Sequence, residues 1–205
     1  MKGTSPGEGQ RFFPYFFKSW RILLWAFVLA YPLLPCWVDA QKAEGVGVSR
    51  YDRLAEEATL LNKRGLYDQT ISLLEPHRED KKNDSALFFN ELGIAYRQKG
   101  KLSEAIQAYQ QAFSRDPENP VVMKNLGDAL YFNKEYVKAI EQYQKALRSN
   151  PRFQQAHSSL GLAYYQLQRY KEALEEFEIV LQLDPKNEQA KKFREAILKK
   201  LRDQK

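Results

Sequence analysis

"LGIAYRQKGKLSEAIQAYQQAF" (residues 92–113) decides the fold, because nearly the same phrase returns twice farther along the chain. It recurs as "LGDALYFNKEYVKAIEQYQKAL" from residue 126 and as "LGLAYYQLQRYKEALEEFEIVL" from residue 160, so each copy begins 34 residues after the one before it. Within each copy the apolar residues follow the spacing of a one-sided helix, and a turn divides the copy into two helices. A repeat in fixed register predicts an array of helix pairs.

Positions that the three copies share define the repeat units 86–119, 120–153 and 154–187. Each unit carries Leu at position 7, Gly at position 8, Ala at position 20 and Pro at position 32. This pattern resembles the tetratricopeptide repeat family, whose 34-residue unit is a pair of antiparallel helices. Small residues at positions 8 and 20 let the two helices approach closely, and the proline ends the second helix. The resemblance implies an all-α fold, a right-handed α-solenoid of antiparallel helix pairs.

Both ends of the array depart from the repeat. Residues 51–84 predict a degenerate helix pair, in which Glu57 and Thr70 stand where the other copies have Leu and Ala, followed by a charged, solvated linker over residues 77–84. Residues 188–205 predict a basic amphipathic helix, which caps the stack through Ala190, Phe193 and Ile197. The prediction sums to nine helices and no sheet.

The N-terminal residues read as a targeting segment. A basic stretch over residues 1–21 is followed by an uncharged apolar run over residues 22–38 and by small side chains before Gln41. The run is shorter than the roughly 20 residues of a membrane-spanning helix, so residues 1–40 favour a secretory signal peptide, with a flexible lead over residues 41–50. The alternatives are an uncleaved membrane anchor and, through Cys36, a lipoprotein. The expected location is therefore periplasmic or secreted, or else anchored to a membrane.

The net charge of +6 has its main source in the last helix. A solvated face is the first interpretation of these basic residues, and contact with anionic lipid is the second. Membrane contact through the leader or through this helix is thus an alternative to a purely protein partner. Nucleic acid is not an expected partner, because an exported protein rarely meets it.

The chain offers few groups for catalysis. It has two histidines, of which His157 falls at a packing position of the third repeat and His77 falls in the charged linker. No cluster of His, Cys and Asp has the spacing of metal ligands, and no serine lies in a nucleophile turn. We therefore expect no enzyme activity, no cofactor and no metal.

The resemblance implies a binding groove instead, lined by positions 2, 5, 6, 9, 12 and 13 of each first helix. Asparagine amides and aromatic rings in such a groove suit an extended peptide or a partner helix. The interpretation against it is that these residues are simply exposed. The predicted groove residues are Asn90, Glu91, Ile94, Arg97, Lys124, Asn125, Asp128, Tyr131, Phe132, Ser158, Ser159, Leu162 and Tyr165.

One specialisation of the family, the clamp that holds the C-terminal carboxylates of chaperones, is not expected. Asn125 matches its middle position, but the residues at the other four positions are Asn90, Ile94, Gln155 and Ser159, which lack the required cations. The hypothesis from the sequence is a non-catalytic adaptor that binds a peptide segment or helix during cell-envelope assembly. The alternative is a structural subunit of a larger envelope complex, tethered to the membrane by residues 22–38.

Overall fold

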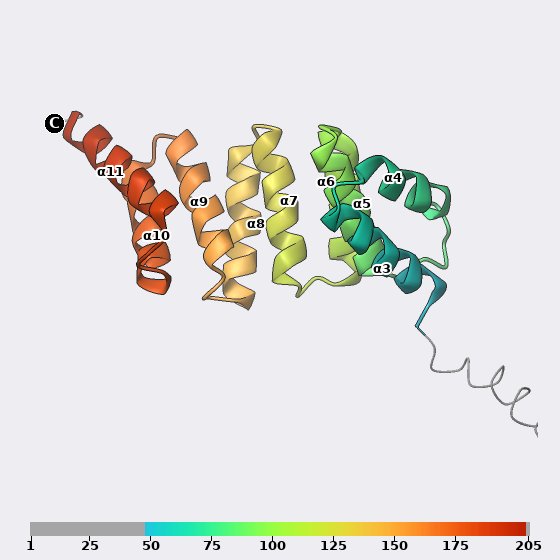
Figure 1. Cartoon of the computed structure of the whole chain (residues 1–205). Helices are drawn as coiled ribbons and strands as arrows, with labels where there is room; N and C mark the ends of the chain where they lie inside the picture. Colours follow the sequence, from blue (N-terminus) through green and yellow to red (C-terminus); the bar gives the residue numbers. More distant parts are fainter. Residues whose placement is uncertain (1–47, 204–205) are drawn as a thin grey trace, which may run out of the picture. The chain divides into compact units, whose positions relative to one another are not determined.

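The structure, a computed structural model, describes residues 48–203. Within these residues it contains nine α-helices, one short 3-10 helix and no strand. Figure 1 shows the helices following one another in chain order as packed pairs. The elements are α3 (Arg50–Lys63), α4 (Tyr67–Leu74), η2 (Glu75–His77), α5 (Ala86–Gln98), α6 (Leu102–Arg115), α7 (Pro120–Phe132), α8 (Tyr136–Ser149), α9 (Gln154–Gln166), α10 (Tyr170–Leu183) and α11 (Glu188–Asp203). The predicted all-α repeat superhelix is confirmed.

Local sequence explains where the first helices begin. The Oγ atom of Ser85 accepts a hydrogen bond from the Phe88 amide at 3.2 Å, which caps α5. Asn119 caps α7 in the same way, and Pro120 occupies its first turn, where a missing N–H costs nothing. The helices α5 and α7 thus begin at residues 86 and 120, and α9, whose start has no side-chain cap, begins at residue 154. These are the first residues of the predicted units.

The turn inside each pair requires a left-handed backbone. Gly65 and Gly100 meet this requirement with φ angles of 74°. The turns of the next two repeats place Lys134 and Gln168 at φ angles of 64° and 59°, which side chains other than glycine adopt at a cost. The turn geometry is therefore kept even where the favoured residue is missing.

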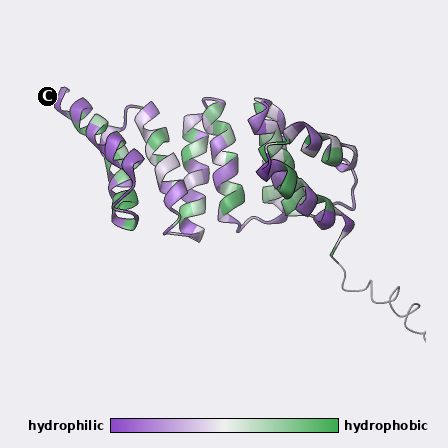
Figure 2. Ribbon diagram, viewed as in Figure 1, coloured by the Kyte–Doolittle hydropathy of each residue, from purple (hydrophilic) through white to green (hydrophobic). Residues whose placement is uncertain are grey.

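The two helices of a repeat meet where a glycine faces an aromatic ring. A Cβ atom added to Gly93 would lie 2.7 Å from Cε1 of Tyr109, and one added to Gly127 would lie 2.6 Å from Cε1 of Tyr143. The alanines at position 20 are fully buried beside these contacts. Apolar and polar residues alternate around the helices in Figure 2, as one-sided packing requires.

The degenerate first pair belongs to the same compact unit as the repeats, which spans residues 48–205. Thr70 is fully buried at the position of the repeat alanine, and its hydroxyl donates to Oδ1 of Asn62 at 2.9 Å. The linker over residues 77–84 was predicted to be solvated, and for Asn83 this is wrong. Asn83 is 2% exposed, and its backbone carbonyl oxygen accepts two hydrogen bonds from the side chain of Arg115, at 3.0 and 2.9 Å. The arginine therefore holds this residue against the following helix.

The last helix covers the final repeat. Ala190 and Ile197 of α11 are buried, and the ring of Phe193 stacks on Phe177 with centroids 5.0 Å apart. The predicted signal peptide and flexible lead fall almost wholly on residues 1–47, outside the described residues. In the part of the chain that the structure describes, no helix combines the length and apolar character needed to cross a membrane.

Candidate functional site

The first helices of the three repeats form one row, because α7 contacts both α5 and α9. Phe132 is the most open of the predicted groove residues in this row, and 56% of its surface is exposed. The other predicted groove residues that remain half-buried are Ile94, Arg97, Lys124, Asp128, Tyr131, Ser158, Ser159, Leu162 and Tyr165.

Asn90, Glu91 and Asn125 are buried, although they were predicted to line the groove. The amide of Asn125 donates to Oδ1 of Asn90 at 2.9 Å, and the amide of Asn90 donates to Oε1 of Glu91 at 3.3 Å. Asn62 of α3 donates to the other carboxylate oxygen of Glu91 at 2.8 Å. Because these side chains already bond to one another, they join neighbouring repeats and offer little to a ligand.

Asp128 lies at the centre of a second polar group in the row. Its carboxylate forms an ion pair with Lys124 at 2.8 Å. It also accepts hydrogen bonds from the hydroxyls of Tyr143 at 2.9 Å and Ser159 at 3.3 Å. Burial, reinforced by the charge of Asp128, raises the pKa of Tyr143, so this phenol stays protonated and remains a donor. The charge of Asp128 is therefore neutralised within the chain.

A pocket of about 170 Å³ opens next to this polar group. The rings of Tyr131 and Phe132 meet edge to face with centroids 5.6 Å apart, and the amide of Gln166 donates to the Tyr131 hydroxyl at 3.1 Å. The pocket combines a cation, a neutralised carboxylate and apolar walls. The residues that line it are Arg97, Asp128, Tyr131, Phe132, Tyr143, Ser159 and Leu162.

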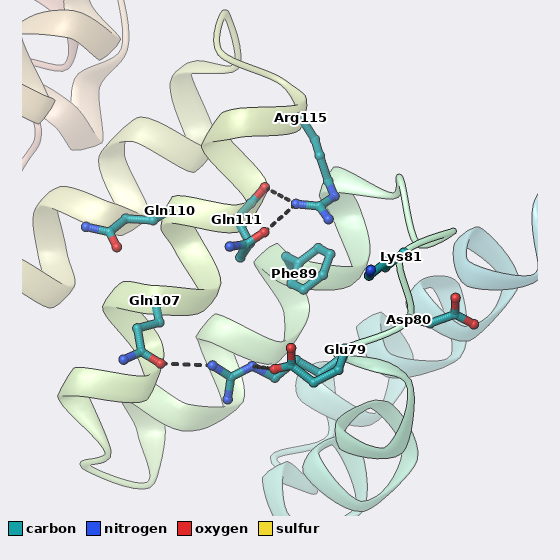
Figure 3. Close-up of a pocket in the computed structure, with 9 residues that line it drawn as sticks. Glu79, Asp80, Lys81, Phe89, Gln107, Gln110, Gln111 and Arg115 are labelled. Atoms are coloured by element: carbon teal, nitrogen blue, oxygen red, sulfur yellow. Dashed lines mark hydrogen bonds and ion pairs between the residues drawn. The ribbon is translucent and has the colours of Figure 1, made fainter.

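A larger pocket of about 310 Å³ lies between α6 and the linker over residues 78–81, and sequence reasoning missed it (Figure 3). The guanidinium of Arg115 lies 4.1 Å above the Phe89 ring and also donates to the carbonyl oxygen of Gln111. Arg78 donates to Oε1 of Gln107 at 2.8 Å. Both arginines already bond to groups of this chain. We therefore interpret the pocket as part of the polar contact that holds the linker against α6. No local sequence pattern predicts this pocket, because its residues come from three separate segments.

His157 has a structural environment. Its Nδ1 atom lies 2.7 Å from Oε2 of Glu176, and its Nε2 atom lies 3.1 Å from the carbonyl oxygen of Pro151. The bond to Glu176 raises the pKa of His157, against the opposing effect of burial. Glu176 is half-buried, and its carboxylate fixes the ring of His157. Among residues 48–203 no three His, Cys, Asp or Glu side chains gather as metal ligands.

The described geometry has counterparts among known proteins. A family model described as the tetratricopeptide repeat matches residues 90–151 and, again, residues 124–188. No match was found among curated proteins. Solved structures give many matches, of which three are informative.

The first tetratricopeptide domain of Spaghetti (RPAP3), bound to the HSP90 peptide SRMEEVD, is 34% identical over 57% of this chain and 92% of its own, with a TM-score of 0.56. The tetratricopeptide domain of Sgt2 from Aspergillus fumigatus is 28% identical over 58% of this chain and 80% of its own, with a TM-score of 0.55. The pilF protein of Pseudomonas aeruginosa is similar in fold, with 24% identity over 75% of this chain and 69% of its own and a TM-score of 0.67.

Proposed function

This chain belongs to the tetratricopeptide repeat family, and we propose that it is a non-catalytic adaptor that holds a segment of a partner protein in the groove formed by α5, α7 and α9. The observation that carries the proposal is the pocket of about 170 Å³, with Phe132 standing 56% exposed at its edge. A large aromatic ring is strongly favoured to bury its surface, and rings of this kind are typical of the residues that dominate binding energy in interfaces.

The similarity to the first domain of Spaghetti (RPAP3) supports a peptide as the ligand, since that domain is bound to an HSP90 peptide. The identity of the peptide is not carried over. Ile94, Gln155 and Ser159 stand where the chaperone clamp needs other residues. Asn125, the one position that matches, is buried and bonds to Asn90. We therefore propose the binding mode, and a partner other than a chaperone C-terminus.

Site-specific photocrosslinking tests the proposal in cells that express the full chain. A benzophenone amino acid replaces Phe132 in one variant and Val137, which is 61% exposed on α8, in a matched control. We expect a protein adduct from position 132 and none from position 137, with the adduct mapping to one segment of the partner. Equal adducts from both positions, or an adduct from position 137 alone, would refute the groove as the binding surface.

The compartment is a separate part of the proposal. We propose an exported protein with a role in cell-envelope assembly, supported by the basic and apolar segments within residues 1–40. The alternative is a membrane-tethered subunit anchored by residues 22–38. Mass spectrometry of the protein isolated from its native cells separates the two. A mature chain that begins at Gln41 supports export and excludes the anchor, and a chain that retains residues 22–38 reverses this result.

A further inference from the structure

The three repeats differ at one internal contact between their two helices, the one between positions 9 and 24. In the second repeat the hydroxyl of Tyr143 donates to the carboxylate of Asp128 at 2.9 Å. The third repeat has Leu162 and Phe177 at these positions, so neither side chain needs a polar partner. The first repeat keeps the tyrosine, as Tyr109, but carries an isoleucine at position 9. The first repeat therefore has the phenol but not the carboxylate that accompanies it in the second repeat.

The consequence is visible in two buried polar atoms. The hydroxyl oxygen of Tyr109 and the Nε atom of Arg97 are both covered and have no hydrogen-bond partner. The two groups are close enough that the charge of Arg97 opposes the burial that raises the pKa of Tyr109. Buried donors of this kind are costly when they are left unpaired. Arg97 and Tyr109 together form a donor site that lacks an acceptor.

Arg97 is the one cation of the predicted groove that forms no ion pair among the residues that the structure describes. Lys124, the other cation, pairs with Asp128 at 2.8 Å. No carboxylate lies within ion-pair distance of Arg97 in the described part of the chain, and its guanidinium instead lies 5.9 Å from the centre of the Phe132 ring. Arg97 is half-buried and forms part of the wall of the pocket.

We propose that this pocket is specific for an acidic side chain of the partner segment that lies next to an apolar one. The carboxylate binds the guanidinium of Arg97, and the apolar side chain fills the space bounded by Phe132, Tyr131 and Leu162. Asp128 does not oppose it, because its own charge is already neutralised. We assign a side-chain carboxylate because an aspartate side chain fills the same role in the second repeat. This inference rests on the proposed function and specifies its ligand.

A randomised library of octapeptides, acetylated and amidated at its ends, tests the inference by affinity selection on the full chain. Mass spectrometry of the bound peptides gives the enrichment of each residue type. We expect Asp or Glu to be enriched within two residues of a Leu or an aromatic residue. Arg97→Gln is expected to reduce the acidic enrichment roughly tenfold, since hydrogen bonds between charged groups are strong, and to keep the apolar enrichment. Arg148→Gln, which changes an exposed arginine on α8, is the matched control.

A second variant tests the missing acceptor directly. Ile94→Asp introduces at position 9 the carboxylate that the second repeat already has. This carboxylate takes up the donors of Arg97 and Tyr109 from within the chain, so the acidic enrichment is expected to disappear although the arginine is still present. The thermal denaturation midpoint of each variant is measured alongside, so that a lost preference is read only from folded protein. Persistent acidic enrichment in folded Ile94→Asp would overturn the inference.

The outcomes separate this inference from the proposed function. Peptides that are selected through Phe132 but show no acidic preference, or the same preference in Arg97→Gln, overturn the inference and leave the groove in place. A second library has free C-termini. If its peptides bind in a way that depends on Arg97 and the amidated peptides do not, the carboxylate that binds is the C-terminus of the peptide, and the inference is also overturned. If every peptide selected by the full chain still binds Phe132→Ser, or if no peptide is selected, the inference and the peptide-binding function both fall.

Discussion

Replacing Gly127 with alanine tests the close packing of α7 against α8. The added Cβ atom would lie 2.6 Å from Cε1 and 2.8 Å from Cδ1 of Tyr143. Non-bonded carbon atoms pack best at about 3.5–4.0 Å, so α7 and α8 must separate by about 1 Å or the ring must turn. The ring has little freedom to turn, because it is 1% exposed and its hydroxyl is bonded to Asp128.

Two opposing effects set the size of the loss. Overpacking of a closely packed core costs about 1–3 kcal/mol, whereas alanine in a helix gains about 0.5–1 kcal/mol over glycine. We therefore expect Gly127→Ala to lower the free energy of unfolding by about 1–2 kcal/mol, which corresponds to a fall in the thermal midpoint of roughly 2–8 °C. Circular dichroism at 222 nm of the full chain measures the midpoint.

A matched variant makes the test quantitative. A Cβ atom added to Gly161 would lie 3.0 Å from the ring of Phe177, so Gly161→Ala should lower the midpoint by less than Gly127→Ala. The double variant Gly127→Ala/Tyr143→Leu removes the ring, so the alanine should cost less in that background. An unchanged or higher midpoint for Gly127→Ala would show that helix propensity outweighs the contact, and the reasoning would be wrong.

Three further predictions concern stability. The bond to Glu176 raises the pKa of His157, so its stabilising contribution is full below about pH 6.5 and is lost as the pH rises through the higher folded pKa. Midpoints measured across this range should fall with pH in the native chain more than in His157→Gln, and parallel curves would contradict this. Asn125→Ala leaves Asn90 without its donor and should cost about 1–3 kcal/mol in urea denaturation. An unchanged urea midpoint would show that the bond is not maintained in solution. Lys134→Gly relieves a φ angle of 64° and should stabilise the fold by about 1 kcal/mol, and a lower urea midpoint would refute the strain.

The helix pairs were predictable because repeated local patterns specify them. Leucine, glycine and alanine at fixed positions of a 34-residue unit define which helix faces meet, and proline defines where they end. The helices α5, α7 and α9 accordingly begin 34 residues apart, at residues 86, 120 and 154. The contact between Gly127 and Tyr143 was likewise foreseen as a close approach of two helices.

Side-chain partners across repeats were not predictable in the same way. Periodicity places Asn90 and Asn125 on the groove side. It does not reveal that their side chains form a hydrogen bond across a separation of 35 residues. Asn83 lies in a strongly polar linker, and its burial depends on Arg115 of the following helix. The binding role that we propose for Arg97 depends in turn on which nearby acids are already paired, and only the three-dimensional arrangement decides this.

The line of hydrogen bonds from Thr70 through Asn62, Glu91 and Asn90 to Asn125 has a consequence for folding cooperativity. In a linear array, stability is the sum of what each repeat contributes alone and what each interface adds. The first pair contributes little alone, because its second helix α4 has 8 residues and isolated helices shorter than about 12–15 residues are marginal. The interface must supply the rest. Amides of α3 and α5 should therefore share one opening free energy in native-state hydrogen exchange, so that the degenerate pair and the first full repeat open as a single folding unit.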